Sequence, residues 1–113
     1  MNWKNLESVE LLEALLQASY QKPVAIFKHS TRCSISSMAM SRIERNWDTL
    51  PIDFELYYLD LLTYRPVSNA IEAQLGIEHQ SPQLLFIENG KCIYHASHSE
   101  ISISELIPLI KAS

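Results

Sequence analysis

Glycine is scarce in this chain: among its 113 residues only Gly76 and Gly90 are glycines, against an average usage of about 7%. Neither of the glycine-rich loops that cradle nucleotide phosphates, GxGxxG or GxxxxGK, can be written with two glycines this far apart. Nucleotide binding through such a loop is therefore excluded. Each glycine is expected to stand where the backbone needs it.

Positive charge and long apolar runs are also lacking. Nine Lys and Arg stand against 13 Asp and Glu, a net charge of −4. Because no broad cationic surface can form, neither nucleic acid nor an anionic membrane is an expected partner. The most apolar stretch, Leu6 to Leu16, is interrupted by three glutamates. It predicts neither a membrane span nor a secretory signal.

Cysteine occurs only twice, and the two positions lie far apart. With no export signal, this predicts a reducing, cytoplasmic setting in which both thiols are free. No C-x-x-C or H-x₃₋₅-H pair is present, so no metal site is predicted. The length and the 47% apolar content indicate one globular domain over residues 1–113.

Apolar periodicity and turn residues predict eight elements along the chain. A capping box at Ser102 and Glu105 favours the last helix, although Pro108 predicts a kink or a late start there. In order, the elements are a helix capped by Ser8 and ending before Pro23, a strand at 24–27, a helix with Ile35, Met38, Ala39, Ile43 and Trp47 on one side, a strand at 54–59, a helix from Arg65-Pro66 to Gly76, strands at 84–87 and 92–94 joined by Asn89-Gly90, and a helix over 102–110.

This order of elements predicts an α/β fold. Two βα units followed by a hairpin and a helix indicate a three-layer sandwich around a mixed four-stranded sheet, with an extra N-terminal helix. The first two strands are expected to be parallel and the last two antiparallel. This is a thioredoxin-like architecture.

Cys33 follows a predicted buried strand and stands at the first turn of the next helix. Unpaired N–H groups and the helix dipole favour a thiolate there. Arg32 adds a cation, and the hydroxyls of Thr31, Ser34 and Ser36 are potential donors to the sulfur. Because these neighbours are polar, we interpret Cys33 as a nucleophile rather than as a buried structural cysteine.

The spacing C-x-x-S places Ser36 where a dithiol oxidoreductase carries its resolving cysteine. A serine cannot form a disulfide, so the predicted enzyme is monothiol and needs a thiol from outside to complete its cycle. Cys92 is on a different element and is interpreted as core packing. Pro82 is predicted to follow a cis bond facing Cys33, with the backbone of Ser81 exposed for pairing with a bound thiol or peptide.

Three separated motifs now resemble a known family. The segments 27–36 (FKHSTRCSIS), 64–69 (YRPVSN) and 79–83 (HQSPQ) are similar to those of the monothiol bacilliredoxins, which have a thioredoxin-like fold. The best-known members read T-C-P-I-S, whereas this chain has Arg32 before the cysteine and Ser34 after it.

The resemblance implies that Cys33 removes bacillithiol, or a similar low-molecular-weight thiol, from mixed disulfides on cytoplasmic proteins. Ser36 would replace the resolving cysteine, and the thiol would be a co-substrate, with no tightly bound cofactor. Bacillithiol carries two carboxylates on its malate moiety, so Arg32, Lys28 and Arg65 are candidate recognition groups.

Other interpretations of the same residues stay open. His29 or His79 could tune a nearby thiolate or be solvated loop histidines. An iron–sulfur cluster bridged by two monothiol proteins is a cofactor-binding alternative, although the glycine-containing loop of that branch is absent. A redox-inactive adaptor protein with a thioredoxin fold is a further alternative.

Overall fold

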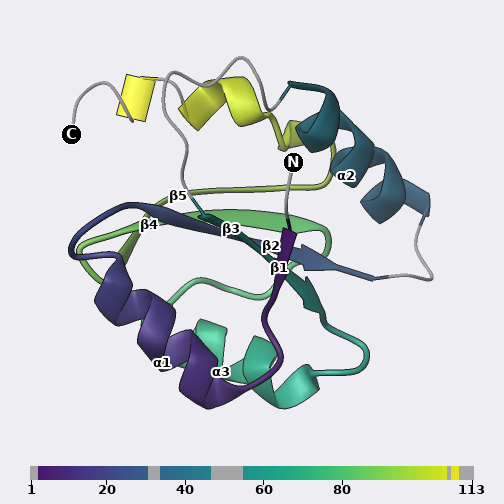
Figure 1. The fold of residues 1–113 in the computed structure, drawn as a ribbon. Coiled ribbons are helices and arrows are strands. Elements are labelled where there is room, and N and C mark those ends of the chain that lie inside the picture. Colours follow the sequence, from purple (N-terminus) through teal and green to yellow (C-terminus); the bar gives the residue numbers. More distant parts are fainter. Residues whose placement is uncertain (1–2, 31–33, 47–54, 107, 110–113) are drawn as a thin grey trace.

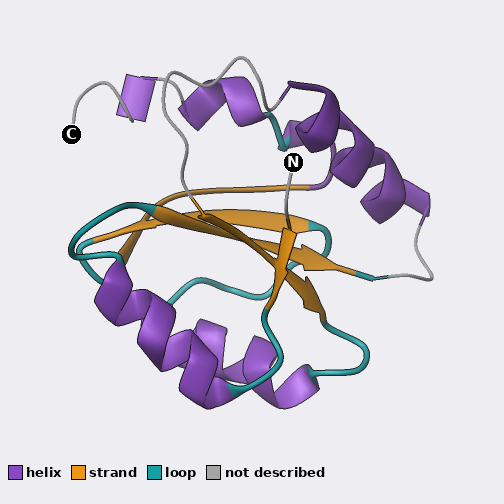
Figure 2. Cartoon of the chain, in the orientation of Figure 1, coloured by secondary structure: helices purple, strands orange, loops and turns teal. Residues whose placement is uncertain are grey.

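The computed structural model describes residues 3–30, 34–46, 55–106 and 108–109 (Figure 1). A central sheet is covered on one face by α1 and α3 and on the other by α2 and the segment after β5 (Figures 1 and 2). The elements are β1 (Trp3–Asn5), α1 (Val9–Ala18), β2 (Val24–His29), α2 (Ser34–Asn46), β3 (Glu55–Asp60), α3 (Arg65–Leu75), β4 (Gln83–Glu88), β5 (Lys91–Ser97), and the 3₁₀ turns η2 (His98–Glu100) and η3 (Ile103–Leu106).

The sheet has the strand order β1-β3-β2-β4-β5. Strands β1, β3 and β2 are parallel, and β4 and β5 run antiparallel to their neighbours. The predicted three-layer α/β sandwich is confirmed, but the count of four strands was wrong. Residues Trp3–Asn5 pair with Leu56–Tyr58 as a fifth strand. A three-residue edge strand with one apolar side chain has too little alternation to be recognised in sequence.

The sheet separates two apolar clusters, one under each helical layer. Along β2, Ala25 and Phe27 pack on the α2 side, whereas Val24 and Ile26 pack on the side of α1 and α3. This alternation follows from the two-residue period of a strand. All six residues of β2 are buried, so the strand runs through the centre of the molecule.

Helix α2 buries a narrower face than its sequence predicts. Ala39 and Ile43 are buried as expected, but Met38 is 62% exposed. The side chain of Ile35 and all of Trp47 lie outside the described structure. Ser36 is fully buried on the side of Ala39 and Ile43, three and seven residues before them. A buried serine on the inner face directs Met38 toward solvent, which an apolar count alone does not reveal.

The predicted Asn89-Gly90 hairpin is confirmed. Both residues have positive φ, 55° and 74°, as the tight turn between antiparallel strands requires. A Cβ on Gly90 would lie 2.6 Å from the Tyr20 hydroxyl oxygen. The Tyr20 side chain is exposed and could move aside, so the positive φ is the main requirement for glycine at this position.

The C-terminal segment differs from the predicted helix over 102–110. The described part holds the short turn η3 (Ile103–Leu106) and helical residues at 108 and 109. Pro108 has no backbone N–H to donate to the preceding turn, which is consistent with the 3₁₀ form of residues 103–106. Within the described ranges, no helix is both long and apolar enough to cross a membrane.

Candidate active site

Three connections meet at one edge of the sheet. The parallel strands β2 and β3 both end there, at His29 and Asp60. The antiparallel strand β4 begins beside them, because Gln83 pairs with Lys28. This edge therefore gathers the segment before α2, the start of α3, and the Ser81–Pro82 bond. That bond is cis, as predicted.

The segment that the sequence singles out is only partly described. Cys33, Thr31 and Arg32 lie outside the described residues, so their predicted roles are not tested by the structure. Helix α2 is described from Ser34, which follows Cys33 in the sequence and is exposed. Figure 1 shows this helix beginning at the edge where β2 ends.

Ser36 lies at the centre of a buried hydrogen-bonded group. Its Oγ is 2.7 Å from Nδ1 of His29 and accepts a hydrogen bond from the Ser30 backbone N–H at 3.1 Å. Ser36 has no exposed surface, and His29 is only 5% exposed. Because Oγ already accepts from Ser30, its hydroxyl proton is available to Nδ1 of a neutral His29. The serine therefore joins the end of β2 to the first turns of α2.

Burial favours the neutral form of His29. It lowers the pKa of the imidazole, an effect that the charge of Asp60 and a contact with the Ser36 backbone partly oppose. The ring also packs against those of Phe27 and Tyr58, with centroids 5.8 and 5.3 Å away. The alternative of a solvated loop histidine is therefore wrong for His29, which is the last residue of a buried strand.

Lys28 lies on the opposite face of the sheet. Its side chain is fully buried, and its Nζ is 3.2 Å from Nδ1 of His79, which is also 3.3 Å from the hydroxyl of Ser68. Burial lowers the pKa of the Lys28 amine, and the nearby Glu72 opposes this. Lys28 is thus turned toward α3 and away from solvent.

His79 holds the chain ahead of the cis bond in place. Its backbone N–H donates to Oε2 of Glu72 at 2.8 Å. Burial and the charge of Lys28 lower the pKa of its imidazole, even though the residue as a whole is exposed. Further along, the side chain of Gln83 donates to the carbonyl of Glu78 at 3.1 Å. These contacts fasten the loop that leads to Ser81.

The predicted binding residues at the cis bond lie on this loop. Pro82 is buried, and its carbonyl accepts from the His98 N–H at 3.1 Å. Arg42 of α2 donates in turn to the His98 and Ile101 carbonyls, both at 3.3 Å. The Ser81 Oγ is buried without a hydrogen-bond partner in the described structure. A bound molecule could satisfy that hydroxyl.

Arg65 begins α3 and is exposed at the same edge of the sheet. Pro66 stands at the start of this helix and Gly76 ends it with φ 69°, as the sequence predicts. Unlike Lys28, the Arg65 side chain is accessible to a dissolved carboxylate.

Cys92 has the environment of an unreactive thiol. It is partly buried beside the α1 and α3 cluster, and its Sγ donates to the Tyr94 carbonyl at 3.2 Å. Burial raises the pKa of this thiol, which disfavours the nucleophilic thiolate. The described residues contain no group of three His, Cys, Asp or Glu side chains arranged to hold a metal ion.

Comparison with known proteins now adds the family. The family described as "Monothiol bacilliredoxin BrxC" matches residues 4–106. This chain belongs to the monothiol bacilliredoxin family. A solved structure of a candidate oxidoreductase with a thioredoxin fold is 28% identical, with a TM-score of 0.79 over 91% of this chain and 88% of that one. The role of this bacilliredoxin is therefore of the thiol–disulfide oxidoreductase type.

More distant thioredoxins share the fold alone. Fasciola hepatica thioredoxin is 16% identical, with a TM-score of 0.71 over 96% of this chain and 97% of that one. Saccharomyces cerevisiae mitochondrial thioredoxin 3 is 14% identical, with a TM-score of 0.73 over 98% and 95%. The thioredoxin-like fold predicted from the sequence is confirmed.

Sequence reasoning missed the buried contacts beneath this site. Lys28 and His29 follow an apolar run and resemble the end of a strand, yet both belong to β2 and are buried. His29 contacts Ser36, seven residues further along, whereas Lys28 contacts His79, which in turn contacts Ser68. The only local signal was that two polar residues directly follow the strand core.

Proposed function

We propose that this bacilliredoxin removes a low-molecular-weight thiol, bacillithiol or a close relative, from mixed disulfides on cytoplasmic proteins. The Cys33 thiolate attacks the sulfur of the small thiol. The bond between that sulfur and the protein substrate breaks, and the substrate leaves as a thiolate. A new disulfide now joins Cys33 to the small thiol, so the number of disulfide bonds is unchanged.

A second small thiol completes the cycle by attacking the disulfide on Cys33. This releases a symmetric small disulfide and regenerates the Cys33 thiolate. The environment of Ser36 carries this part of the proposal. Its hydroxyl stands three residues after Cys33 and is held by His29 and Ser30, so that position supplies a structural bond and no resolving sulfur.

Recognition of the small thiol would use the edge of the sheet where these connections meet. We assign the backbone of Ser81 and the bend at Pro82 to docking of the mixed disulfide, with Thr31 and Ser34 beside the sulfur. Arg32 and Arg65 would bind the carboxylates of the thiol. Lys28 would act through its charge, because burial under His79 keeps it from direct contact.

Paired cysteine variants test this function. A purified protein carrying bacillithiol in mixed disulfide is mixed with each variant and with free bacillithiol, and the thiol set free on that protein is measured. Cys33→Ser is expected to fall to the uncatalysed rate, because no nucleophile remains. Cys92→Ser is expected to keep most of the wild-type rate, since that thiol is partly buried and has a raised pKa. Equal rates for the two variants would contradict the proposal and favour an adaptor.

A further inference from the structure

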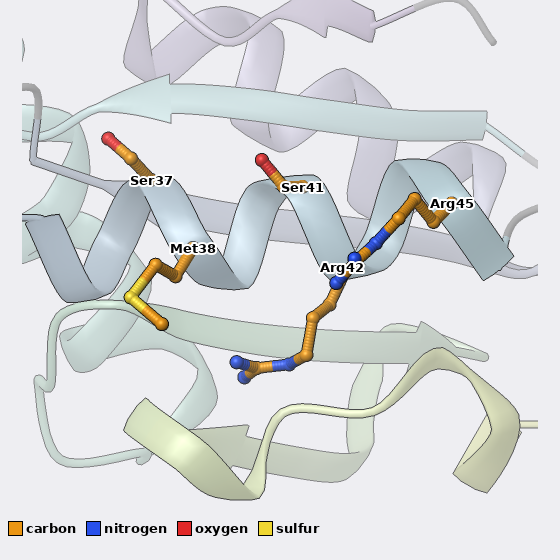
Figure 3. A pocket seen from close by; sticks show the side chains of 5 residues that line it. All are labelled: Ser37, Met38, Ser41, Arg42 and Arg45. Carbon is orange, nitrogen blue, oxygen red and sulfur yellow. The ribbon is translucent and has the colours of Figure 1, made fainter.

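The solvent-facing side of α2 holds a shallow groove of about 420 Å³ (Figure 3). Figure 3 shows Ser37 and Ser41 on one border and Met38 and Arg42 on the other, with Arg45 extending back along the helix. The described residues that line the groove all belong to α2: Ser37, Met38, Ser41, Arg42 and Arg45.

The groove is cationic on a chain whose net charge is −4. Lys4–Glu55 is the one salt bridge among the residues that the structure describes, so Arg45 has no carboxylate partner there. The Arg42 guanidinium donates to the backbone carbonyls of His98 and Ile101 and forms no salt bridge within the described part of the chain. Glu44 on the same helix and Glu100 and Glu105 on the neighbouring turns are exposed, but among the described residues none of them forms a salt bridge with either arginine.

The groove also extends along α2, the helix that follows the proposed nucleophile in the sequence. Helix α2 begins at Ser34, directly after Cys33 in the sequence. At about 1.5 Å per helical residue, Arg42 and Arg45 lie about 12 and 16 Å along the helix. An extended peptide advances about 3.3 Å per residue, so these arginines lie about four to five residues from a cysteine exchanging at the helix start.

We infer that this groove on α2 docks an acidic segment of the thiolated protein substrate. Glutamate or aspartate side chains about four to five residues from the substrate's modified cysteine would meet Arg42 and Arg45, and Met38 would contact their neighbours. The rest of the surface repels such a segment because the chain is acidic, so attraction at the groove orients the substrate. This inference rests on the proposed function.

Thiolated peptides provide the test. Each peptide carries one cysteine in mixed disulfide with bacillithiol. The fourth and fifth residues from this cysteine are either two glutamates or two glutamines. In one set of peptides these residues lie on the N-terminal side of the cysteine, and in the other set they lie on the C-terminal side. At low salt, wild type is expected to react about fivefold faster with the glutamate peptide of one set, as expected for one or two exposed ion pairs. The preference should shrink as salt is added.

Substitutions test whether the preference for the glutamate peptide depends on α2. Arg45→Gln should remove most of it, and Arg45→Glu should favour a matched lysine peptide. Lys91→Glu makes the same change in net charge at the β4–β5 turn and should keep the preference. Arg42 is left unchanged because it also holds the segment at 98–101.

The outcomes separate the two proposals. Reaction with all peptides at equal rates would overturn the docking inference and leave the exchange function standing. Equal slowing of bacillithiol disulfide and of the acidic peptide by Arg45→Glu would also overturn it, because the groove would then hold the small thiol. Absence of any exchange would contradict the proposed function.

Binding can be followed without exchange. Cys33→Ser is titrated with the same peptides carrying serine in place of cysteine, and amide NMR shifts are recorded. Shifts along Ser37 to Arg45 with the glutamate peptide alone would support docking. Equal shifts with both peptides, or none along this helix, would overturn it.

Discussion

Lys28 and His29 are neighbours on β2, yet their side chains lie on opposite faces of the sheet. His29 faces α2 and forms a short contact, 2.7 Å, with the Ser36 hydroxyl. Lys28 faces α3 and reaches only a longer contact, 3.2 Å, with the imidazole of His79. Both side chains are buried, but one pair is neutral and the other contains a desolvated amine.

The difference shows how two separate connections are secured at one site. The neutral pair ties β2 to α2, the helix that follows the proposed nucleophile. The Lys28 contact secures the loop before the cis bond of Pro82. A buried neutral pair stabilises its connection because each partner satisfies the other. A buried amine costs free energy that its single imidazole partner does not fully offset.

The largest expected effect is on the α2 side. Ser36→Ala should lower the free energy of unfolding by about 2 kcal/mol, because the Ser30 N–H and the His29 imidazole both lose a buried partner. Chemical denaturation measures the change. Ser37→Ala is the matched control on the exposed side of the same helix and should stay within about 0.5 kcal/mol of wild type. Similar losses for the two variants would contradict the role of Ser36.

A substitution on the α3 side is expected to increase the free energy of unfolding. Lys28→Met should raise the free energy of unfolding at pH 7 by about 1 kcal/mol, because it removes a desolvated amine that lacks a carboxylate in contact. Burial lowers the pKa of Lys28, so the cost is full at neutral pH and falls as the pH rises through the lowered value toward 10.5. The advantage of Lys28→Met should therefore shrink in alkaline buffer.

Lys91→Met is the exposed control for that comparison. It removes the same charge at the β4–β5 turn and should show no pH-dependent gain of this kind. A marked loss of stability in Lys28→Met at pH 7 would show that the amine stabilises the loop more than its burial costs.

A smaller effect is expected from acid. Because burial lowers the pKa of His29 below 6.5, its contribution to stability is full above pH 6.5. The contribution is lost as the pH falls through the lowered value, because the unfolded chain binds the proton more readily. Wild type should lose stability between pH 7.5 and 5.5, and His29→Gln should lose less. His79 shares the same direction, so part of the slope should remain.

His95→Gln is the control for the acid experiment. His95 is exposed on β5, and its removal should leave the wild-type slope unchanged. An equally steep slope in His29→Gln would show that the buried imidazole does not govern this pH dependence.

The sequence predicts those parts of the molecule that depend on local pattern. The Ser8 cap accepts from the Leu11 N–H, Gly76 ends α3, and the Asn89-Gly90 turn forms as expected, because each follows from short-range backbone chemistry. The cis bond before Pro82 followed from the predicted fold. The burial of Lys28 could not be predicted, since it depends on α3 and on the loop at His79, which are distant in sequence.

Mass spectrometry of the exchange intermediate tests the central claim most directly. The protein is mixed with an equal amount of a bacillithiol mixed disulfide, quenched in acid before a second thiol is added, and digested for peptide mapping. The account predicts bacillithiol on Cys33 and an unmodified Cys92. An unmodified Cys33, or an adduct confined to Cys92, would contradict it.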